Sequence, residues 1–344
     1  MKEFIMNKTI VLIVFCLMVL VACNNDKKTV KNDTNRMSID SVETIESISQ
    51  KIRENPLNAD LFLERSELHM QELNAREAIS DVELAIKIDS LRPDIYTRLS
   101  DYNMTIGQSE QAKDILVKAV NKFPLNTEAR LKLAYIYFYV DMYDEAMNEI
   151  KFLEENNLQE AEVYFLKAMI FDAVEMYDDA IRTLGTAIEY NNNYWEAYNL
   201  LGLIYASLDN KLAVEYFITA TNLFPDNLEI RYHAGYVFQK FGLIDKAINE
   251  YEYIISIDPN HFLSYFNLGD IYVNNLKDNK RSVEYFSKAI EIDPKSYKAY
   301  YNRGYVYELM GNYKLAESDY RKSLEIFPNY ELAVQGLNEV LEKQ

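Results

Sequence analysis

The sequence predicts an all-α solenoid in which about eight helical hairpins stack one on the next, with a capping helix at each end. First, six prolines lie close to multiples of 34 residues apart, while the seventh, Pro93, begins a unit. Second, four glycines lie 33, 34 and 35 residues apart. Periods of this length are typical of repeat proteins, whose units stack to bury their apolar faces. The glycines are Gly202, Gly235, Gly269 and Gly304.

Composition agrees with a folded helical chain and limits its partners. Of 344 residues, 49% are hydrophobic and 26% charged, with only seven prolines and nine glycines. This composition is typical of folded rather than disordered chains. The net charge of -18 argues against nucleic acid as a partner, because phosphate backbones are bound by dense basic surfaces.

The first residues predict a cleaved signal peptide over residues 1–22. Lys2 and Lys8 precede an apolar run over residues 10–21, as in the charged and hydrophobic regions of secretory signals. That run is too short to span the hydrocarbon core as a helix, which takes about 20 residues. We therefore expect cleavage rather than a membrane-spanning anchor.

The residues Leu20-Val21-Ala22-Cys23 resemble the lipobox of bacterial lipoproteins. The resemblance implies lipidation of Cys23, cleavage before it, and a cell-envelope protein anchored by acyl chains, which hold firmly when there are several. Asn24, directly after Cys23, resembles the residue at this position in lipoproteins that are sorted to the outer membrane. Which leaflet the protein occupies stays undecided. Residues 23–37 are expected to form a polar tether. The alternative is an ordinary signal peptide with a chance cysteine.

The residues between the prolines resemble the tetratricopeptide repeat (TPR) family. Its pattern has an aromatic residue at position 4, a small one at 8, tyrosine at 11, alanine at 20, an aromatic at 24 and proline at 32. The segment from Tyr297 supplies, at those positions, Tyr300, Gly304, Tyr307, Ala316, Tyr320 and Pro328. The register divides residues 59–330 into eight units: 59–92, 93–126, 127–160, 161–194, 195–227, 228–261, 262–296 and 297–330. The first two units depart from the pattern, with Ser66 and Ser100 at position 8.

The resemblance implies a right-handed α-solenoid with shielded ends. Residues 38–58 are expected to form an N-terminal capping helix, because Ile39, Val42, Ile45, Ile48 and Ile52 recur every three or four residues. Residues 331–344 are expected to form the C-terminal cap. Its predicted apolar stripe consists of Leu332, Val334, Leu337, Val340 and Leu341.

The resemblance also places positions 2, 5, 9 and 12 of each first helix on the concave face of the solenoid. Aromatic residues gather at positions 5 and 9 in the later repeats, and tyrosine suits interfaces because it combines large area with a polar end. The predicted protein-binding groove consists of Tyr135, Phe165, Tyr232, Tyr236, Phe266, Tyr301 and Tyr305. The alternative is that these rings pack between repeats and expose only their edges.

Acidic residues also recur at position 2, from Asp60 to Glu229. They indicate either an acidic groove for a basic peptide or carboxylates that complement the helix dipole. TPR modules that bind the C-terminal carboxylate of a chaperone tail need Lys at position 5 and Asn at position 9 of one repeat. No repeat here supplies both. That ligand class is therefore disfavoured.

Nothing in the sequence indicates catalysis, a metal or a cofactor. His69, His233 and His261 are far apart, without metal-binding spacing, and no nucleophile-elbow or P-loop motif occurs. The first hypothesis is therefore a non-enzymatic scaffold of the bacterial cell envelope, anchored in the membrane by lipid, that binds a protein or peptide partner. The second is a carbohydrate- or small-ligand-binding lipoprotein that uses the aromatic groove. Oligomeric state is undecided.

Overall fold

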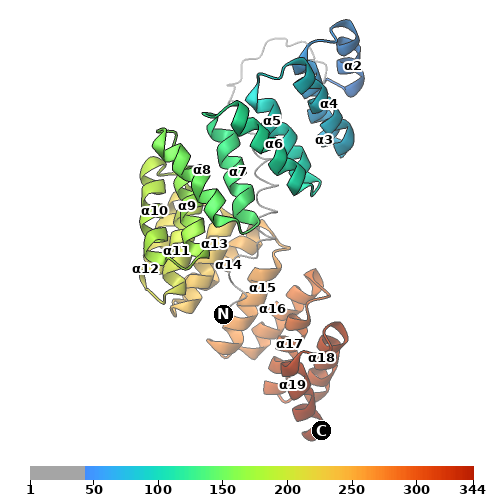
Figure 1. Cartoon of the computed structure of the whole chain (residues 1–344). Helices are drawn as coiled ribbons and strands as arrows, with labels where there is room; N and C mark the ends of the chain where they lie inside the picture. The colour runs from blue at the N-terminus through green and yellow to red at the C-terminus, as the bar shows by residue number, and fades with distance from the viewer. Residues whose placement is uncertain (1–42) are drawn as a thin grey trace, which may run out of the picture. The chain divides into compact units, whose positions relative to one another are not determined.

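The structure, a computed structural model, describes residues 43–344. This part of the chain contains eighteen α-helices and no β-strand, and Figure 1 shows the helices following one another in pairs. The predicted all-α class, built from consecutive helical hairpins, is confirmed. The described residues divide into two compact units, residues 43–174 (unit 1) and residues 175–344 (unit 2).

Unit 1 consists of a single helix followed by hairpins. Helix α3 packs on α4, α5 on α6 and α7 on α8, and each hairpin packs on the next through α4 and α5 and through α6 and α7. Helix α2 packs on α3. The helices are α2 (Ile45–Glu54), α3 (Ala59–Gln71), α4 (Ala75–Ile88), α5 (Pro93–Thr105), α6 (Ser109–Lys122), α7 (Thr127–Tyr139), α8 (Tyr143–Glu155) and α9 (Ala161–Ala173).

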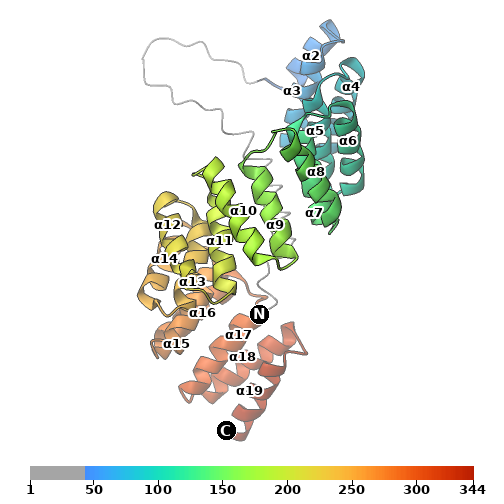
Figure 2. The same ribbon diagram turned by 60° about the vertical axis from the view of Figure 1, so that its left-hand side comes forward.

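Unit 2 follows the same scheme and ends on a single helix. The hairpins α11–α12, α13–α14, α15–α16 and α17–α18 stack in order, and α19 packs on α18 (Figures 1 and 2). The helices are α10 (Tyr177–Tyr190), α11 (Trp195–Ser207), α12 (Leu212–Leu223), α13 (Leu228–Lys240), α14 (Ile244–Ile257), α15 (Phe262–Asn274), α16 (Asn279–Ile292), α17 (Tyr297–Leu309), α18 (Tyr313–Ile326) and α19 (Glu331–Glu342).

Positions are counted below from the first residue of each first helix: α3, α5, α7, α9, α11, α13, α15 and α17. The predicted repeat boundaries, as a division of the chain into domains, stay a prediction. The boundary between the two compact units lies inside the predicted unit 161–194.

Between the first and second helix of each repeat, one residue has a positive φ. In the hairpin α17–α18 this residue is Gly311, and the N–H of Asn312 donates to the carbonyl of Tyr307 at 2.8 Å. This bond ends a helix in the Schellman motif, which needs a left-handed residue that is usually glycine. Seven of the eight residues occupy position 15. They are Leu73, Gly107, Asp141, Glu175, Asp209, Gly242, Gly311 and, one position later, Lys277.

In unit 2 the two helices of a hairpin meet at a small residue and a large ring, which we call the small–large contact. A Cβ added to the glycine at position 8 would lie 2.6 to 3.0 Å from the ring opposite, closer than carbon atoms pack. Only glycine therefore fits without movement of the ring. The pairs are Gly202 with Phe217, Gly235 with Tyr251, Gly269 with Phe286, and Gly304 with Tyr320.

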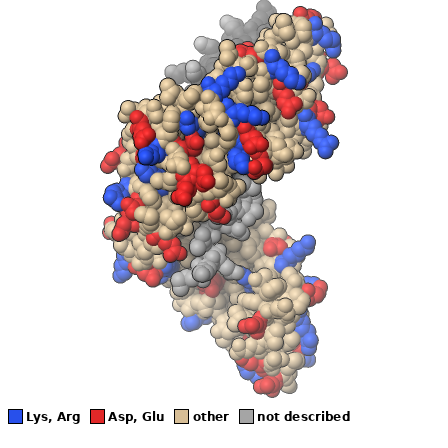
Figure 3. Space-filling model, in the orientation of Figure 1, with Lys and Arg blue, Asp and Glu red and all other residues tan. Residues whose placement is uncertain are grey.

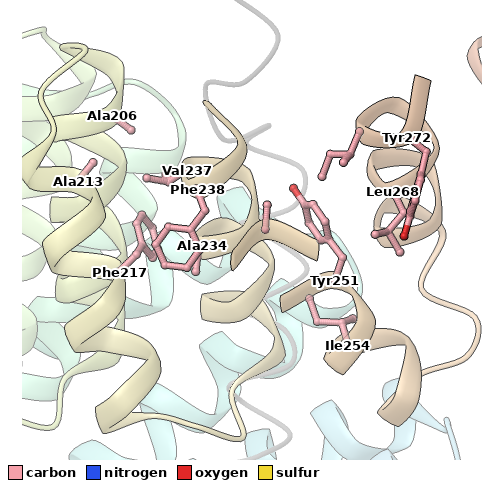
Figure 4. Packing of buried hydrophobic residues seen from close by; sticks show 12 residues of the cluster. Ala206, Ala213, Phe217, Ala234, Val237, Phe238, Tyr251, Ile254, Leu268 and Tyr272 are labelled. Atoms are coloured by element: carbon pink, nitrogen blue, oxygen red, sulfur yellow. The ribbon is translucent and has the colours of Figure 1, made fainter. Parts of the chain in front are cut away.

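Figure 4 shows this core around Phe217 and Tyr251, with Ala213 and Ala234 beside them. Both rings are fully buried, as are the two alanines. Burial of a large side chain stabilises a fold by about 1.5–3 kcal/mol. Adjacent hairpins share one core, because the same cluster includes Leu268 of α15.

In two hairpins an arginine at position 7 of the first helix pairs with an aspartate of the second helix. In α3–α4, Arg65 donates to both oxygens of Asp81, at 2.7 and 2.6 Å, and in α17–α18 Arg303 does the same to Asp319, at 2.7 and 2.8 Å. Both carboxylates are almost completely buried, so each depends on its arginine for charge balance.

The N-terminal cap agrees with its predicted stripe within the described residues. Helix α2 buries Ile48 and Ile52 and half-buries Ile45, and its side chain cap is Thr44, which accepts from the N–H of Ser47. Ile39 and Val42 lie outside the described residues.

The predicted stripe of the C-terminal cap is confirmed only for Val340, which is buried, and for Leu337, which is half-buried. Helix α19 buries Ala333, Gly336 and Val340, while Leu332, Val334 and Leu341 are exposed. Apolar residues lie on two sides of this helix, so their spacing alone does not say which side packs. The side that carries Gly336 packs against α18. A Cβ at this glycine would lie 2.6 Å from the ring of Tyr320, so the absence of a side chain allows the two helices to approach this closely.

Three predictions fall outside residues 43–344: the signal peptide 1–22, the lipidation of Cys23 and the tether 23–37. Among the residues that the structure does describe, no helix has both the length and the apolar character needed to cross a bilayer.

Candidate protein-binding surface

The side of the first helices that carries positions 5, 6 and 9 is called the first-helix face below. In unit 1 this face is built from ion pairs that join neighbouring repeats. Arg98 at position 6 of one repeat bonds to Glu67 at position 9 of the repeat before it. Lys132 likewise donates to both oxygens of Asp101, at 2.8 and 2.9 Å. Figure 3 shows acidic and basic side chains interspersed over the N-terminal helices. A partner would have to compete with these internal bonds.

Burial modifies the charge of this face. Asp101 lies largely out of solvent, and desolvation raises the pKa of its carboxyl group although the neighbouring Lys132 opposes the shift. A carboxylate held in this way is balanced by its lysine and offers little free charge to a ligand. The first-helix face of unit 1 is thus largely neutralised by its own residues.

Two predicted groove residues lie in unit 1. Tyr135 is half-buried in α7 and stacks on Tyr139, with 6.3 Å between the ring centroids. Phe165 is half-buried in α9. Each ring therefore presents part of its area, and their role in binding stays a prediction.

In unit 2 the predicted residues at position 5 pack on the large ring of their own hairpin. Tyr232 lies 6.1 Å from Tyr251 between ring centroids, and Phe266 lies 5.5 Å from Phe286. Tyr301 lies 5.7 Å from Tyr320 in the same way. Contacts of this kind stabilise aromatic pairs. These side chains therefore have a packing role, whether or not a partner also touches them.

Tyr232 is flanked by two of the three histidines. The centroid of its ring lies 5.5 Å from that of His233 and 5.5 Å from that of His261, which precedes the next repeat. His233 Nδ1 lies 2.8 Å from Asn199 Oδ1 of the preceding repeat. Burial lowers the pKa of His233 to about 4, so the ring is neutral at ordinary pH.

At position 9 the two tyrosines of unit 2 differ in exposure. Tyr305 is 40% exposed and is the most accessible of the seven predicted residues, whereas Tyr236 is half-buried. Tyr236 follows Tyr232 by four residues in α13, and Tyr305 follows Tyr301 by four residues in α17, so each pair lies on one side of its helix. The structure thus brings the predicted residues together as pairs within α13 and α17.

Polar bonds between successive repeats were not predicted from the sequence. Besides the bond of His233 to Asn199, Gln239 donates to Asp270 Oδ2 at 2.8 Å, and Asn267 donates to the hydroxyl of Tyr251 at 3.0 Å. Asn199 and Asn267 are therefore not isolated. The bonded residues are 34, 31 and 16 positions apart in the sequence, and these separations were the available signal. These separations could not be distinguished from chance, because the sequence does not show how one helix is aligned against the next.

No group of three His, Cys, Asp or Glu side chains within residues 43–344 is arranged to hold a metal ion. The first-helix face consists instead of rings, amides and paired charges. Surfaces rich in tyrosine, with polar groups at their edge, suit contacts with other proteins.

Comparison with known proteins agrees with this architecture. Residues 297–330 match a family model described as Tetratricopeptide repeat, and residues 228–261 and 263–296 match a second model with the same description. The chain therefore contains tetratricopeptide repeats, and such repeats indicate a protein–protein interaction scaffold. They do not indicate an enzyme. No curated protein matches the sequence.

Solved structures share the fold. The crystal structure of the APC/C hetero-tetramer Cut9-Hcn1 matches with a TM-score of 0.56 and 20% identity, over 86% of this chain. This chain spans only 58% of the length of that neighbour. The C-terminal part of a TPR repeat-containing protein from Cytophaga hutchinsonii matches with a TM-score of 0.57 and 17% identity, over 70% of this chain and 99% of its own. These likenesses concern the fold alone.

Proposed function

We propose that this protein is a lipid-anchored scaffold of the bacterial cell envelope that holds a segment of another protein on the first-helix face of unit 2. The observation that carries the proposal is the set of tyrosine rings on α13 and α17, of which Tyr305 is the most open. Tyrosine anchors bind partners well because they bury much area and lose few rotamers.

The anchor is the second part of the proposal. The lipobox-like residues Leu20 to Cys23 support lipidation, and Asn24 supports the outer membrane as the destination. Several acyl chains on one cysteine would hold the protein firmly at the membrane. The first-helix face would then meet its partner close to a membrane surface, where both are concentrated.

The binding surface is tested at its position 9 tyrosines, since Tyr232 and Tyr301 at position 5 also pack inside their hairpins. The partner is first identified by crosslinking in the native host and mass spectrometry. Its affinity for the chain with Tyr236→Ala and Tyr305→Ala is then measured. Loss of one anchor costs about 2 kcal/mol, so we expect affinity to fall at least about 30-fold.

The matched control is Tyr190→Ala, which removes an exposed ring at the end of α10, away from the first helices. Circular dichroism should show that all variants keep their helices. Undiminished affinity of the double variant would remove the first-helix face of unit 2 as the binding surface.

The anchor is tested separately by Cys23→Ala. Without the thiol no thioether to lipid can form, so we expect the protein to move from the membrane fraction to the soluble fraction. Fractionation followed by immunoblotting measures this. A variant that stays in the membrane fraction, and is extracted only by detergent, would contradict lipid anchoring through Cys23.

A further inference from the structure

Helix α19 has the burial pattern of a first helix of a repeat. Counted from Glu331, its buried residues Ala333, Gly336 and Val340 occupy positions 3, 6 and 10. In α13 and α17 the residues at positions 3 and 10 are also buried. Position 6 of α15, Asn267, bonds to the large ring of the preceding hairpin, as Gly336 in α19 contacts Tyr320. Helix α19 therefore docks on α18 as a ninth first helix would.

The opposite side of α19 is the side on which first helices receive their own second helix. Positions 4, 8 and 11 hold Val334, Asn338 and Leu341, which we call the α19 face. In the repeats of unit 2, position 8 lies against the large ring of the second helix. In α19, Val334 is 42% exposed and Leu341 45% exposed. Within residues 43–344, α19 packs mainly on α18 and to a lesser extent on α17.

A hollow of about 620 Å³ lies along this face. Val334 and Asn338 line it, together with Gln335, and its borders are acidic. The lining residues include three glutamates and no lysine or arginine: Glu331, Glu339 and Glu342. Glu339 accepts a bond from Gln335 at 2.8 Å, while Glu331 and Glu342 form no side-chain bond with any described residue.

We propose that the α19 face binds an amphipathic helix of another protein, which completes a ninth hairpin between two chains. Three uncompensated or weakly compensated carboxylates around an apolar strip favour a helix with small apolar residues on one side and Lys or Arg beside them. This second site is separate from the first-helix face of unit 2 and does not rest on the function proposed for that face.

The size of the residue at position 8 limits which apolar residues the partner helix can place opposite it. Asn338 is larger than the glycines that face rings in unit 2. In unit 1, where Ser66 and Ser100 occupy position 8, the residues at position 24 are Val82 and Leu116. The partner helix is therefore expected to place valine, leucine or alanine opposite Asn338, because an aromatic ring would not fit.

The experiment uses a peptide with the sequence of α4, whose inward residues are Ala78, Val82 and Ala85. Its three acidic residues are replaced by lysine, and a staple on its outer side keeps it helical, because short peptides are otherwise marginal helices. Fluorescence anisotropy measures its affinity for the full chain. We expect binding that weakens with salt.

The variants Val334→Glu and Leu341→Glu should each reduce this affinity by about tenfold or more, since each places a charge in the apolar strip. Both residues are exposed, so the fold should tolerate them. Leu212→Glu, at an exposed leucine of α12, is the matched control and should leave the affinity unchanged.

Three results would overturn the proposal. The lysine peptide could fail to bind. A peptide with the same staple and the original acidic residues could bind with the same affinity. The α19 variants could also leave affinity unchanged. If the chain instead forms a dimer that Val334→Glu dissociates, a second copy occupies the face, and the basic partner is refuted. Tyr236→Ala and Tyr305→Ala should leave peptide binding intact, which separates the two surfaces.

Discussion

The two units solve the same packing problem with opposite choices of residue size. In unit 2, glycine at position 8 faces an aromatic ring, as in Gly235 and Tyr251. In unit 1, position 8 holds a larger residue and position 24 a smaller one, as in Ser66 with Val82 and Ser100 with Leu116, all fully buried. The combined size changes much less than either partner. The distance between helices therefore depends on the pair rather than on one residue.

The first-helix faces differ as well. Unit 1 joins its repeats at positions 6 and 9 by ion pairs, such as Lys132 with Asp101, whereas at position 6 of unit 2 His233 bonds to the amide of Asn199. Elsewhere in unit 2 an ion pair, Lys240 with Asp209, also joins two repeats. All residues that match the TPR family models lie in unit 2, where the glycine–aromatic pattern is present. The same fold is therefore compatible with two sets of contact residues. Only the set with glycine and an aromatic ring is easily recognised in the sequence.

The largest expected effect comes from enlarging the residue at position 8 in unit 2, as in unit 1, while the aromatic ring at position 24 is kept. Gly235→Ala would place a Cβ 2.8 Å from the ring of Tyr251. Overpacking costs about 1–3 kcal/mol, part of which the better helix propensity of alanine offsets, so we expect a loss of about 2 kcal/mol. Thermal and urea unfolding of the full chain measure it.

Two further variants sharpen this result. Tyr251→Leu added to Gly235→Ala should restore part of the lost stability, because leucine leaves room for the new methyl group. Gly185→Ala is the matched control: a Cβ there meets no atom within 4 Å, and alanine should stabilise the helix by up to about 1 kcal/mol. Equal effects of both alanines would show that the ring does not exclude a Cβ.

A smaller effect is expected from pH. Burial holds the pKa of His233 at about 4, against an ordinary value of 6.5, so protons bind the unfolded chain more readily between these values. Unit 2 should therefore lose stability as the pH falls below about 6.5, by about 1 kcal/mol at a pH of about 5.5. Position 6 in two repeats of unit 1 holds Arg98 and Lys132 in place of a histidine.

His233→Gln tests this by removing the titrating ring while leaving an amide near Asn199. Urea unfolding is measured for both proteins at several pH values, and only the difference between them is interpreted. We expect the parent protein to lose more stability than the variant on acidification. Parallel curves would show that His233 protonates equally in the folded and unfolded states.

Much of the fold could be predicted because it depends on strong steric rules. Proline ends a helix, and a small residue allows two helices to approach closely, so their period in the sequence indicates hairpins. The same rules explain why Gly304 and Tyr320 could be assigned to one contact. Their positions are fixed by the repeat, and the structure brings them together.

The remaining features depend on geometry that one helix does not encode. The phase of α19 could not be predicted, because Val334 and Val340 lie on different sides of it and either side could pack. The pairs Arg303 with Asp319 and His233 with Asn199 depend on how neighbouring helices are aligned. The binding role of Tyr236 and Tyr305 stays a prediction, because exposure of a ring does not identify what it touches.

The small–large contact also limits how such a gene could diversify. Exchange of a single second helix between the units would bring Tyr251 against Ser66, or leave a void between Val82 and Gly235, and either product would be penalised. Exchange or duplication of a whole hairpin would move both partners together and keep the contact intact. The heritable module of this protein is therefore the hairpin, and recombination points between the repeats are the ones that selection would tolerate.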